Sequence, residues 1–297
     1  MDAASHYVTD KATETGWIRV ENLSVRFATR SEEVVAVDGA SIAVRPGEFV
    51  SIIGPSGCGK STLLNVVAGF LKGSEGTVTI DGKPVDGPSV ERGVVFQQYS
   101  LFPWLTVRKN VEFGLKMKGI GRSARESSAR TLLGLAGLLA FENHYPDQLS
   151  GGMKQRVGIV RALATSPQVL LMDEPFGALD AQTRVVMQEI LTNMWQRFRL
   201  SVLFITHDID EAVFLSDRIY VMTARPGRIK AEIKIDLPRP RTAAMTSSPE
   251  FIAHVQQLRQ LIREESLAAM GSELHDGALS GFATEVGPGG VANIVNA

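Results

Sequence analysis

Apolar and polar residues alternate near the start of the chain, at the spacing expected for short strands. Residues 18–20 and 23–27 follow this pattern, and residues 48–53 form a more continuous apolar run after a Pro-Gly turn, as in a buried strand. Apolar positions within residues 63–71 instead recur at helical spacing. The pattern therefore predicts a change from strand to helix across the glycine-rich segment 54–59.

The rest of the chain alternates helical and strand-like segments. Helical spacing dominates residues 108–165, where residues 131–141 form an apolar stretch of helix length. Further along, the pattern predicts strand 169–172, helix 181–199, strand 201–206, helix 208–214, strand 218–223, a hairpin turn at 224–228, strand 229–235 and a last helix over about 249–270. Strands that alternate with helices in this way predict a parallel sheet with crossover helices.

Composition narrows the class of protein. The chain has 297 residues, of which 44% are hydrophobic and 21% charged, as in ordinary globular proteins of about two domains or subdomains. The net charge of −1 argues against a dedicated nucleic-acid-binding protein. Cys58 is the one cysteine, so the chain can form no internal disulfide, which suits a reducing cytoplasm. No apolar run reaches the about 20 residues of a membrane span, so a role at a membrane requires a partner.

The two ends of the chain differ from its middle. Residues 1–16 are polar and lack an apolar signal core, and we expect a flexible lead-in. Residues 271–297 are rich in glycine, alanine and small polar residues, and we expect a disordered tail. The ordered domain is then predicted to cover residues 17–270.

A phosphate-binding loop is predicted where the strand at 48–53 gives way to a helix. The sequence GPSGCGKS matches the pattern G-x-x-x-x-G-K-[ST], and its members are Gly54, Pro55, Ser56, Gly57, Cys58, Gly59, Lys60 and Ser61. Glycines let backbone N–H groups surround phosphate oxygens, and the helix that follows directs its positive end at the anion. Lys60 supplies a cation for the β- and γ-phosphates, and Ser61 a hydroxyl for Mg²⁺. We interpret Cys58 as a small filler rather than a nucleophile, because no histidine lies near it in the sequence.

A second apolar strand ends in two carboxylates, Asp173 and Glu174. Ligands of open α/β sheets bind at such strand ends, so Asp173 is a candidate Mg²⁺ ligand and Glu174 a candidate for orienting or deprotonating a water molecule. Taken alone, the pair could equally be solvated acids at the end of a strand. The long helix-rich segment between Lys60 and Asp173 predicts an inserted subdomain.

The segment Leu149 to Arg156 contains another potential anion site. Ser150 has the character of a helix N-cap, and Gly151 and Gly152 leave the start of the helix open. Taken alone, this motif is no more than an ordinary serine-capped helix.

These motifs, in this order, resemble those of the ATP-binding subunits of ABC transporters over about residues 18–265. The matching segments are the phosphate loop 54–62 including Thr62, the Q-loop Phe96-Gln97-Gln98-Tyr99, the signature Leu149 to Gln155, Asp173-Glu174, the D-loop Gly177-Ala178-Leu179-Asp180 and the switch residue His207. The resemblance implies an α/β P-loop fold with a RecA-like core, an antiparallel β subdomain and a helical signature subdomain at about 100–165. Gln97 alone could be any polar loop residue, and His207 alone a capping or core histidine.

The resemblance also implies a mechanism and a set of contacts. Two subunits face each other head to tail, and each ATP lies between the phosphate loop of one and Ser150-Gly151-Gly152 of the other. Gln155 and Asp180 are implied nucleotide contacts, and Ser61, Gln97 and Asp173 are implied Mg²⁺ contacts. Glu174, His207 and Lys60 are the implied catalytic residues. Phe27 lies about where the family stacks an aromatic ring on adenine, although it could instead be a core residue.

Two further segments resemble one branch of the family, the importers of nitrate, taurine and alkanesulfonates. They are residues 101–107, with Pro103-Trp104, and residues 223–241, with an Arg-Pro-rich run at 236–241. The alternatives are a packing role for Trp104 and a solvated linker for the run. The resemblance implies a membrane permease, a second ATP-binding subunit in a homodimer, an indirect link to a substrate-binding protein, and a position at the cytoplasmic face of the membrane.

Two other functions compete with import. A soluble ATPase acting on ribosomes would carry two sets of motifs, and one acting on DNA would carry long coiled coils, whereas this chain has one set and no heptad repeat. An exporter subunit is disfavoured by the Pro-Trp segment and by the lack of a fused membrane domain.

Overall fold

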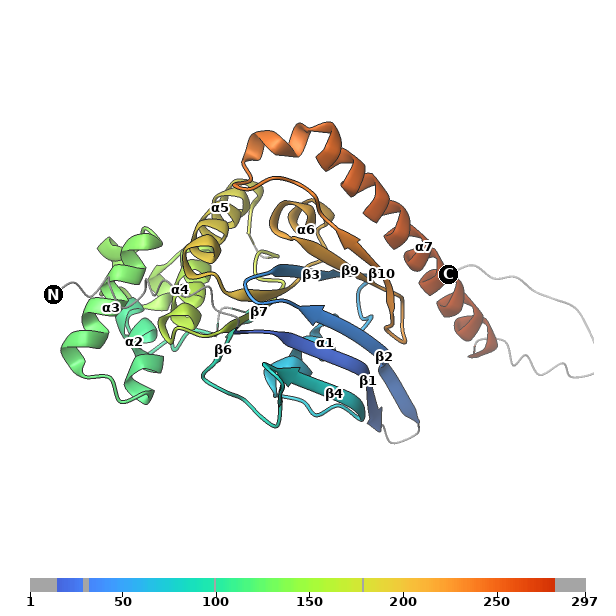
Figure 1. Ribbon diagram of the computed structural model, residues 1–297, viewed down its shortest axis with the longest axis horizontal. Coiled ribbons are helices and arrows are strands. Elements are labelled where there is room, and N and C mark those ends of the chain that lie inside the picture. The colour runs from blue at the N-terminus through green and yellow to red at the C-terminus, as the bar shows by residue number, and fades with distance from the viewer. Residues whose placement is uncertain (1–14, 29–31, 99, 178, 281–297) are drawn as a thin grey trace, which may run out of the picture.

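The computed structural model describes residues 15–28, 32–98, 100–177 and 179–280, with side chains described up to residue 267. Two β-sheets lie at the centre of the molecule, and most of the helices gather on one side and at one end of them (Figure 1). Within the described residues, no helix combines the length and the hydropathy needed to cross a bilayer.

The smaller sheet is antiparallel. Its order is β2-β1-β4-β5, formed by β1 (Ile18–Ala28), β2 (Glu33–Val44), β4 (Glu75–Ile80) and β5 (Lys83–Pro84). The two short strands predicted at 18–20 and 23–27 are parts of the single strand β1. The pairing of β1 with β2 shifts between Val20 and Leu23, and Asn22 adopts φ +49° there. This irregularity explains why the apolar alternation changes phase inside one strand.

The larger sheet carries the parallel core that the alternation of strands and helices predicts. Its order is β10-β9-β3-β8-β7-β6, formed by β3 (Phe49–Ile53), β6 (Arg92–Val95), β7 (Val169–Asp173), β8 (Ser201–Ile205), β9 (Arg218–Met222) and β10 (Ile229–Lys234). Neighbouring strands are parallel except for β10, which returns antiparallel to β9 through the predicted hairpin.

The larger sheet is covered on both faces, which explains its continuous apolar strands. Val50 and Ile52 of β3 belong to a core shared with the antiparallel sheet and α1 (Lys60–Ala68). Phe49 and Ile53 point to the opposite core. That core is built with α5 (Ala181–Phe198), α6 (Ile209–Leu215) and α7 (Pro249–Ser280).

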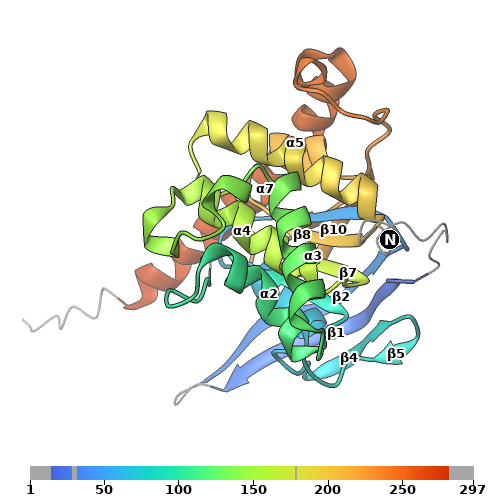
Figure 2. The same ribbon diagram turned by 90° about the vertical axis from the view of Figure 1, so that its left-hand side faces the viewer.

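The segment between β6 and β7 is helical and lies at one end of the molecule, on the left in Figure 1 and facing the viewer in Figure 2. It contains α2 (Val107–Met117), α3 (Arg122–Leu135) and α4 (Gly151–Ala164), with short 3₁₀ turns at Leu139–Phe141 and Pro146–Gln148. The single helix predicted over 131–141 is wrong. Helix α3 ends at Leu135, and Gly137 adopts φ +67°, so the chain turns before Phe141.

The ends of the ordered domain also depart from the predicted boundaries. Gly16 donates its N–H to the Asp81 carboxylate at 2.9 Å, while residues 1–14 lie outside the described residues. Helix α7 continues through Gly271 to Ser280. One glycine in a helix costs only about 1 kcal/mol relative to alanine, so Gly271 need not end the helix. Residues 281–297, where disorder is predicted, lie outside the described residues.

Candidate nucleotide site

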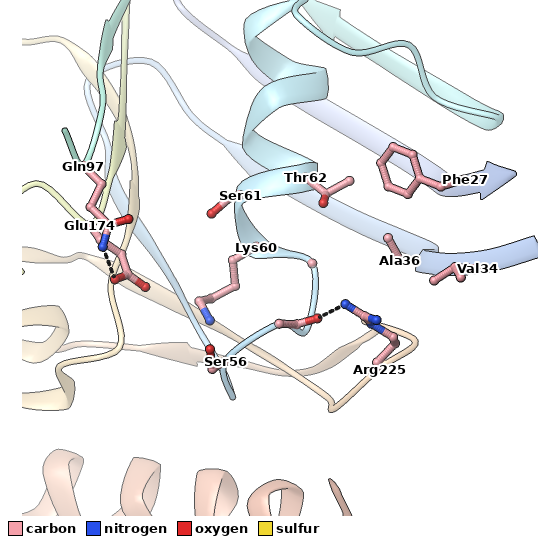
Figure 3. Close-up of a pocket in the computed structure, with 12 residues that line it drawn as sticks. Phe27, Val34, Ala36, Ser56, Lys60, Ser61, Thr62, Gln97, Glu174 and Arg225 are labelled. Carbon is pink, nitrogen blue, oxygen red and sulfur yellow. Dashed lines mark hydrogen bonds between the residues drawn. The ribbon is translucent and has the colours of Figure 1, made fainter. Parts of the chain in front are cut away.

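The predicted phosphate loop connects β3 to α1 and curls around the ammonium of Lys60. Lys60 Nζ donates to the carbonyl oxygens of Gly54 and Pro55 at 2.9 and 2.8 Å. Gly59 caps the helix at φ +102°, and a Cβ there would lie 2.6 Å from the carbonyl oxygen of Ala36. Only glycine fits this position, because the backbone conformation and the close approach of β2 both exclude a side chain. The loop and the start of α1 are drawn in Figure 3.

Cys58 fills space beneath the loop. Its side chain is buried, and its Sγ lies 3.8 Å from Lys60 Nζ. Burial raises the pKa of the Cys58 thiol, an effect only partly opposed by Lys60. A protonated, buried thiol is a poor nucleophile, which agrees with the interpretation of Cys58 as a filler.

The carboxylate of Asp173, at the end of β7, faces the start of α1. Ser61 Oγ donates to Asp173 Oδ1 at 3.0 Å, and burial raises the pKa of Asp173 while this hydrogen bond opposes the rise. A hydroxyl beside a carboxylate is the oxygen donor set that suits Mg²⁺, which in nucleotide sites takes most of its remaining ligands from phosphate and water. The described residues contain no cluster of three or more His, Cys, Asp or Glu that could hold a metal ion.

Glu174 is held between Gln97 and His207. Its backbone adopts φ +41° and donates to the carbonyl oxygen of Ile205 at 2.9 Å. Its Oε2 accepts from Gln97 Nε2 at 3.4 Å and lies 3.1 Å from His207 Nδ1. The three side chains follow the ends of β6, β7 and β8, which are neighbours in the sheet. The parallel sheet therefore brings together three residues that are far apart in the sequence.

Several of these groups, among them Lys60, Ser61 and Glu174, border one open pocket of about 380 Å³, whereas Asp173 and His207 do not line it (Figure 3). It is lined by Phe27, Val34, Ala36, Ser56, Gly57, Gly59, Lys60, Ser61, Thr62, Gln97, Glu174 and Arg225. Phe27 is 41% exposed, so it is not the core residue that the alternative interpretation allowed.

Sequence reasoning missed three of the residues that line this pocket. Val34 pairs with Phe27 across β1 and β2, and Ala36 follows on the same strand, so only the strand register could have revealed them. Arg225 belongs to the turn after β9, in a segment that resembles one branch of the family, but no nucleotide-binding motif marks it.

A second group of predicted residues lies outside this pocket, where α4 and α5 begin. Ser150 Oγ accepts the N–H of Met153 at 3.3 Å, as expected of an N-cap. Asp180 caps α5 by accepting from the N–H and hydroxyl of Thr183 at 2.9 and 2.7 Å. A Cβ at Gly152 would lie 2.5 Å from Thr183 Cγ2, so the two helix starts pack against each other. We refer to Ser150, Gly151, Gly152 and Asp180 as the helix-start face.

Gln155, which the resemblance implies as a nucleotide contact, lies apart from this face. It is 1% exposed and lies one helical turn beyond the buried Gly152, on the inward side of α4. A nucleotide on the surface could not reach it without a rearrangement. Two other members of the predicted motifs, Tyr99 and Ala178, lie outside the described residues.

The segment that contains Trp104 presents aromatic side chains to solvent. Trp104 is 71% exposed, and its ring lies 5.6 Å from that of Phe102, which in turn lies 4.6 Å from Phe113. Phe102 and Phe113 line a shallow groove of about 390 Å³ together with Arg161. The exposure of Trp104 argues against a role confined to packing.

The Arg-Pro-rich run at 236–241 is not a solvated linker. Arg241 is buried and donates to the carbonyl oxygens of Val213 and Ser216 at 3.0 and 2.7 Å, at the end of α6. Arg239 lies over the ring of Trp195 at 4.1 Å and pairs with Asp217 at 2.8 Å. The run therefore fixes α6 and the end of α5 to the sheet.

Comparison with known proteins places these features in a family context. The family model for the ABC transporter matches residues 37–177. The nitrate import ATP-binding protein NrtD of Synechocystis sp. is 48% identical over 83% of this chain and 95% of its own length. The taurine import ATP-binding protein TauB of Rhizobium johnstonii is 48% identical over 82% of this chain and 96% of its own length.

A solved structure is similar as well. The dimeric structure of the ATP-binding cassette MJ0796 bound to ADP and Pi matches with a TM-score of 0.67 and 35% identity, over 74% of this chain and all of that chain. This similarity confirms the predicted fold, which combines a RecA-like parallel core with an antiparallel β subdomain and an inserted helical subdomain.

Proposed function

This chain belongs to the ABC transporter family, and we propose that it is the ATP-hydrolysing subunit of a binding-protein-dependent importer of nitrate, taurine or an alkanesulfonate. The similarity to nitrate and taurine import proteins over most of both lengths supports this branch. The permease and the substrate-binding protein are separate chains, and the choice of solute rests with them.

One observation carries the catalytic part of the proposal, namely the carboxylate of Glu174 held between Gln97 and His207 beside the phosphate loop. Transfer of the γ-phosphoryl group to water depends on positioning and on stabilising charge. Glu174 orients and deprotonates the attacking water, and His207 contacts the γ-phosphate. Lys60 neutralises charge on the β- and γ-phosphates.

The remaining pocket residues bind the substrate as the magnesium complex of ATP. Backbone N–H groups of residues 54–62 surround the phosphates, and the exposed ring of Phe27 stacks on adenine. Magnesium, when bound, draws charge from the phosphate oxygens. Ser61 and Asp173 provide oxygen donors for it, and Gln97 reaches the same region.

The helix-start face serves the nucleotide of a second subunit. Ser150 is exposed at the N-terminus of α4, a position that favours an anion, yet it does not line the pocket of its own chain. Two copies arranged head to tail bring each helix-start face to the other copy's phosphate loop. We take the second copy to be this same chain, so the assembly is a homodimer.

The exposed aromatic segment around Trp104 is the contact with the permease. Its exposed rings beside an apolar groove suit a protein partner, since aromatic residues are enriched in such interfaces. Through this contact the ATPase sits at the cytoplasmic face of the membrane. Nucleic acid is not a partner in this proposal.

A pull-down tests the transport function. The Glu174→Gln protein, tagged and expressed in its native host, is recovered from solubilised membranes with ATP and Mg²⁺, and we expect a multi-helix permease to co-purify. Adding Trp104→Ala should remove the permease while ATP binding persists. Trp17→Ala is the matched control, because Trp17 is also exposed but lies at the start of the antiparallel sheet.

The identity of the partners separates the alternatives. Recovery only in the soluble fraction, with ribosomal or DNA-repair proteins, would overturn the transport function while leaving the ATPase chemistry intact. A permease whose operon partner is a substrate-binding protein supports import, and titration of that protein with nitrate, taurine and alkanesulfonates then identifies the solute.

A further inference from the structure

The turn between β9 and β10, residues 223–228, packs against the phosphate loop. Gly227 is buried, and a Cβ there would overlap the carbonyl oxygen of Cys58. The backbone of Gly227 also donates to the carbonyl oxygen of Ala36 at 3.1 Å and accepts from the N–H of Asp38 at 2.9 Å. The turn is therefore fixed between the loop and β2, and its side chains have defined positions relative to the nucleotide pocket.

Two exposed arginines in this turn have different surroundings. Arg228 donates through Nε to the carboxylate of Asp38 at 2.9 Å. Arg225 donates through Nη2 to the carbonyl oxygen of Gly57 at 3.2 Å and, among the described residues, pairs with no carboxylate. A guanidinium has five N–H donors, so most of those on Arg225 remain available for a ligand.

Arg225 points into the nucleotide pocket, whereas Arg228 does not line it. Figure 3 shows Arg225 across the phosphate loop from Lys60, on the side of Phe27 and Val34. In a nucleotide whose base lies at Phe27 and whose terminal phosphates lie at Lys60, the sugar and the inner phosphates must span the space between these two residues. The guanidinium of Arg225 borders that path beside Gly57.

We propose that Arg225 binds the phosphate chain of the nucleotide on the side of the loop nearer the nucleoside. Its ligand is a nucleoside polyphosphate, and its planar fork of donors matches phosphate oxygens. This inference rests on the proposed ATP site and adds to it a residue that lies outside the segments resembling the family's nucleotide motifs. Lys60 serves the terminal phosphates, and Arg225 serves the phosphates that ATP and ADP share.

Helix α7 holds the turn in place through Glu265. Its carboxylate accepts from the N–H of Ala224 at 3.0 Å and from Lys230 Nζ at 2.8 Å. The preceding residue, Glu264, also pairs with Lys230 at 2.7 Å but, among the described residues, does not bond to the backbone of the turn. Glu265 is therefore a positioning residue for Arg225, and Glu264 is its natural control.

Equilibrium binding of a fluorescent ADP analogue to the full chain tests the proposal. We expect Arg225→Ala to weaken binding of ATP and ADP by a similar factor, roughly 10-fold, as for loss of one charge-assisted hydrogen bond. Arg225→Lys should recover part of the affinity, and Arg228→Ala should bind as the wild type does. Competition by inorganic tripolyphosphate should weaken in parallel for Arg225→Ala.

Each other outcome contradicts a specific statement. Wild-type affinity in Arg225→Ala would exclude Arg225 as a ligand. Loss of nucleotide binding with unchanged tripolyphosphate binding would place Arg225 on the nucleoside and overturn the phosphate assignment. Lys60→Ala separates a wrong role for Arg225 from a wrong ATP site. If Lys60→Ala still binds nucleotide, the proposed ATP site itself is wrong. If Lys60→Ala loses nucleotide binding while Arg225→Ala keeps it, only the role of Arg225 is wrong.

A double-mutant cycle tests the role of Glu265. Glu265→Gln should weaken ADP binding in the same direction as Arg225→Ala but by a smaller factor, about 3-fold, and Glu264→Gln should not. In the Arg225→Ala background, Glu265→Gln should add nothing, because the residue that it positions is gone. An additive loss would show that Glu265 acts on the loop by another route.

Discussion

The nucleotide pocket and the helix-start face both present groups suited to phosphate, but their states within one chain differ. At the pocket and beside it, residues that follow β6, β7 and β8 already bond one another, as Glu174 does with Gln97 and His207. At the helix-start face, Ser150 and Asp180 bond only the first turns of their own helices among the described residues. The fold of one chain therefore assembles the nucleotide pocket. The helix-start face resembles one half of a binding site, a half-site whose other half is missing from the described residues of the same chain.

The largest expected effect comes from the assembled region. Glu174→Gln keeps the shape of the side chain and its contact with His207 but removes the base, so we expect hydrolysis to fall by roughly 10²- to 10⁴-fold while ATP binding persists. Phosphate release and equilibrium binding measure the two quantities. Glu189→Gln, at an exposed position of α5, is the control. Near-normal turnover in Glu174→Gln would remove Glu174 from the reaction.

Mixing two inactive variants tests whether the helix-start face serves a second copy. Lys60→Ala should not bind ATP, and Ser150→Arg should bind ATP but fail to close on it. A head-to-tail heterodimer of the two contains one intact pairing of loop and face, so the mixture should recover a measurable part of the wild-type activity. The steady-state ATPase rate of the mixture measures this recovery.

A second mixture provides the control for this experiment. Lys60→Ala with Glu174→Gln should stay inactive, because in that heterodimer each loop lacks either its lysine or its base. No recovery in the first mixture, from proteins that fold and associate, would mean that loop and face act within one chain.

The sequence predicts the assembled region better than the half-site, for a physical reason. Local chemistry requires glycine at 59, a cation at 60 and acids after an apolar strand, and the parallel sheet then places them together. The burial of Gln155 could not be foreseen, because a motif gives residues in order but does not say which side of α4 faces inward. Arg225 was missed because only the packing of Gly227 on Cys58 brings its turn to the pocket.

The fold was predictable where spacing is regular and less so at its interruptions. The strands and helices from 169 to 235 agree with the apolar pattern to within a few residues. The predicted helix over 131–141 failed at Gly137, and the helix predicted to end near 270 continues because flanking helix formers carry α7 past Gly271 and Gly277. The sequence left a solvated linker open as the alternative for the Arg-Pro run, because the carbonyl oxygens that Arg241 binds belong to another segment.

A buried acid between α5 and α6 makes the stability of the fold depend on pH. Glu211 on α6, after His207, accepts from Gln188 of α5 at 3.2 Å, and burial raises its pKa to about 7. Between about pH 4.5 and 7 the native state keeps a proton that the unfolded chain has lost. The free energy of unfolding therefore falls as pH rises through this window and changes no further, from this group, above it.

Glu211→Gln removes this dependence. Urea unfolding should give equal stabilities for the variant and the wild type near pH 4.5, and at about pH 8 the variant should be more stable by on the order of 1 to 3 kcal/mol. Asp208 and Arg184 also face this carboxylate, and their opposite charges partly cancel. The exposed control Glu189→Gln should have the stability of the wild type at both pH values. If Glu211→Gln also has the stability of the wild type at both pH values, Glu211 does not carry a proton in the native state.

The smallest expected effect separates two roles of Asp180. Asp180→Ala removes the cap of α5 and should lower the free energy of unfolding slightly, whereas Asp180→Asn keeps an equally good cap and should unfold as the wild type does. If Asp180→Asn nevertheless hydrolyses ATP more slowly in the dimer, its carboxylate acts on the second copy's site. If instead only Asp180→Ala, the less stable variant, loses ATPase activity, then Asp180 serves only as the cap of α5. The groups of the helix-start face that act on the second copy would then be Ser150, Gly151 and Gly152.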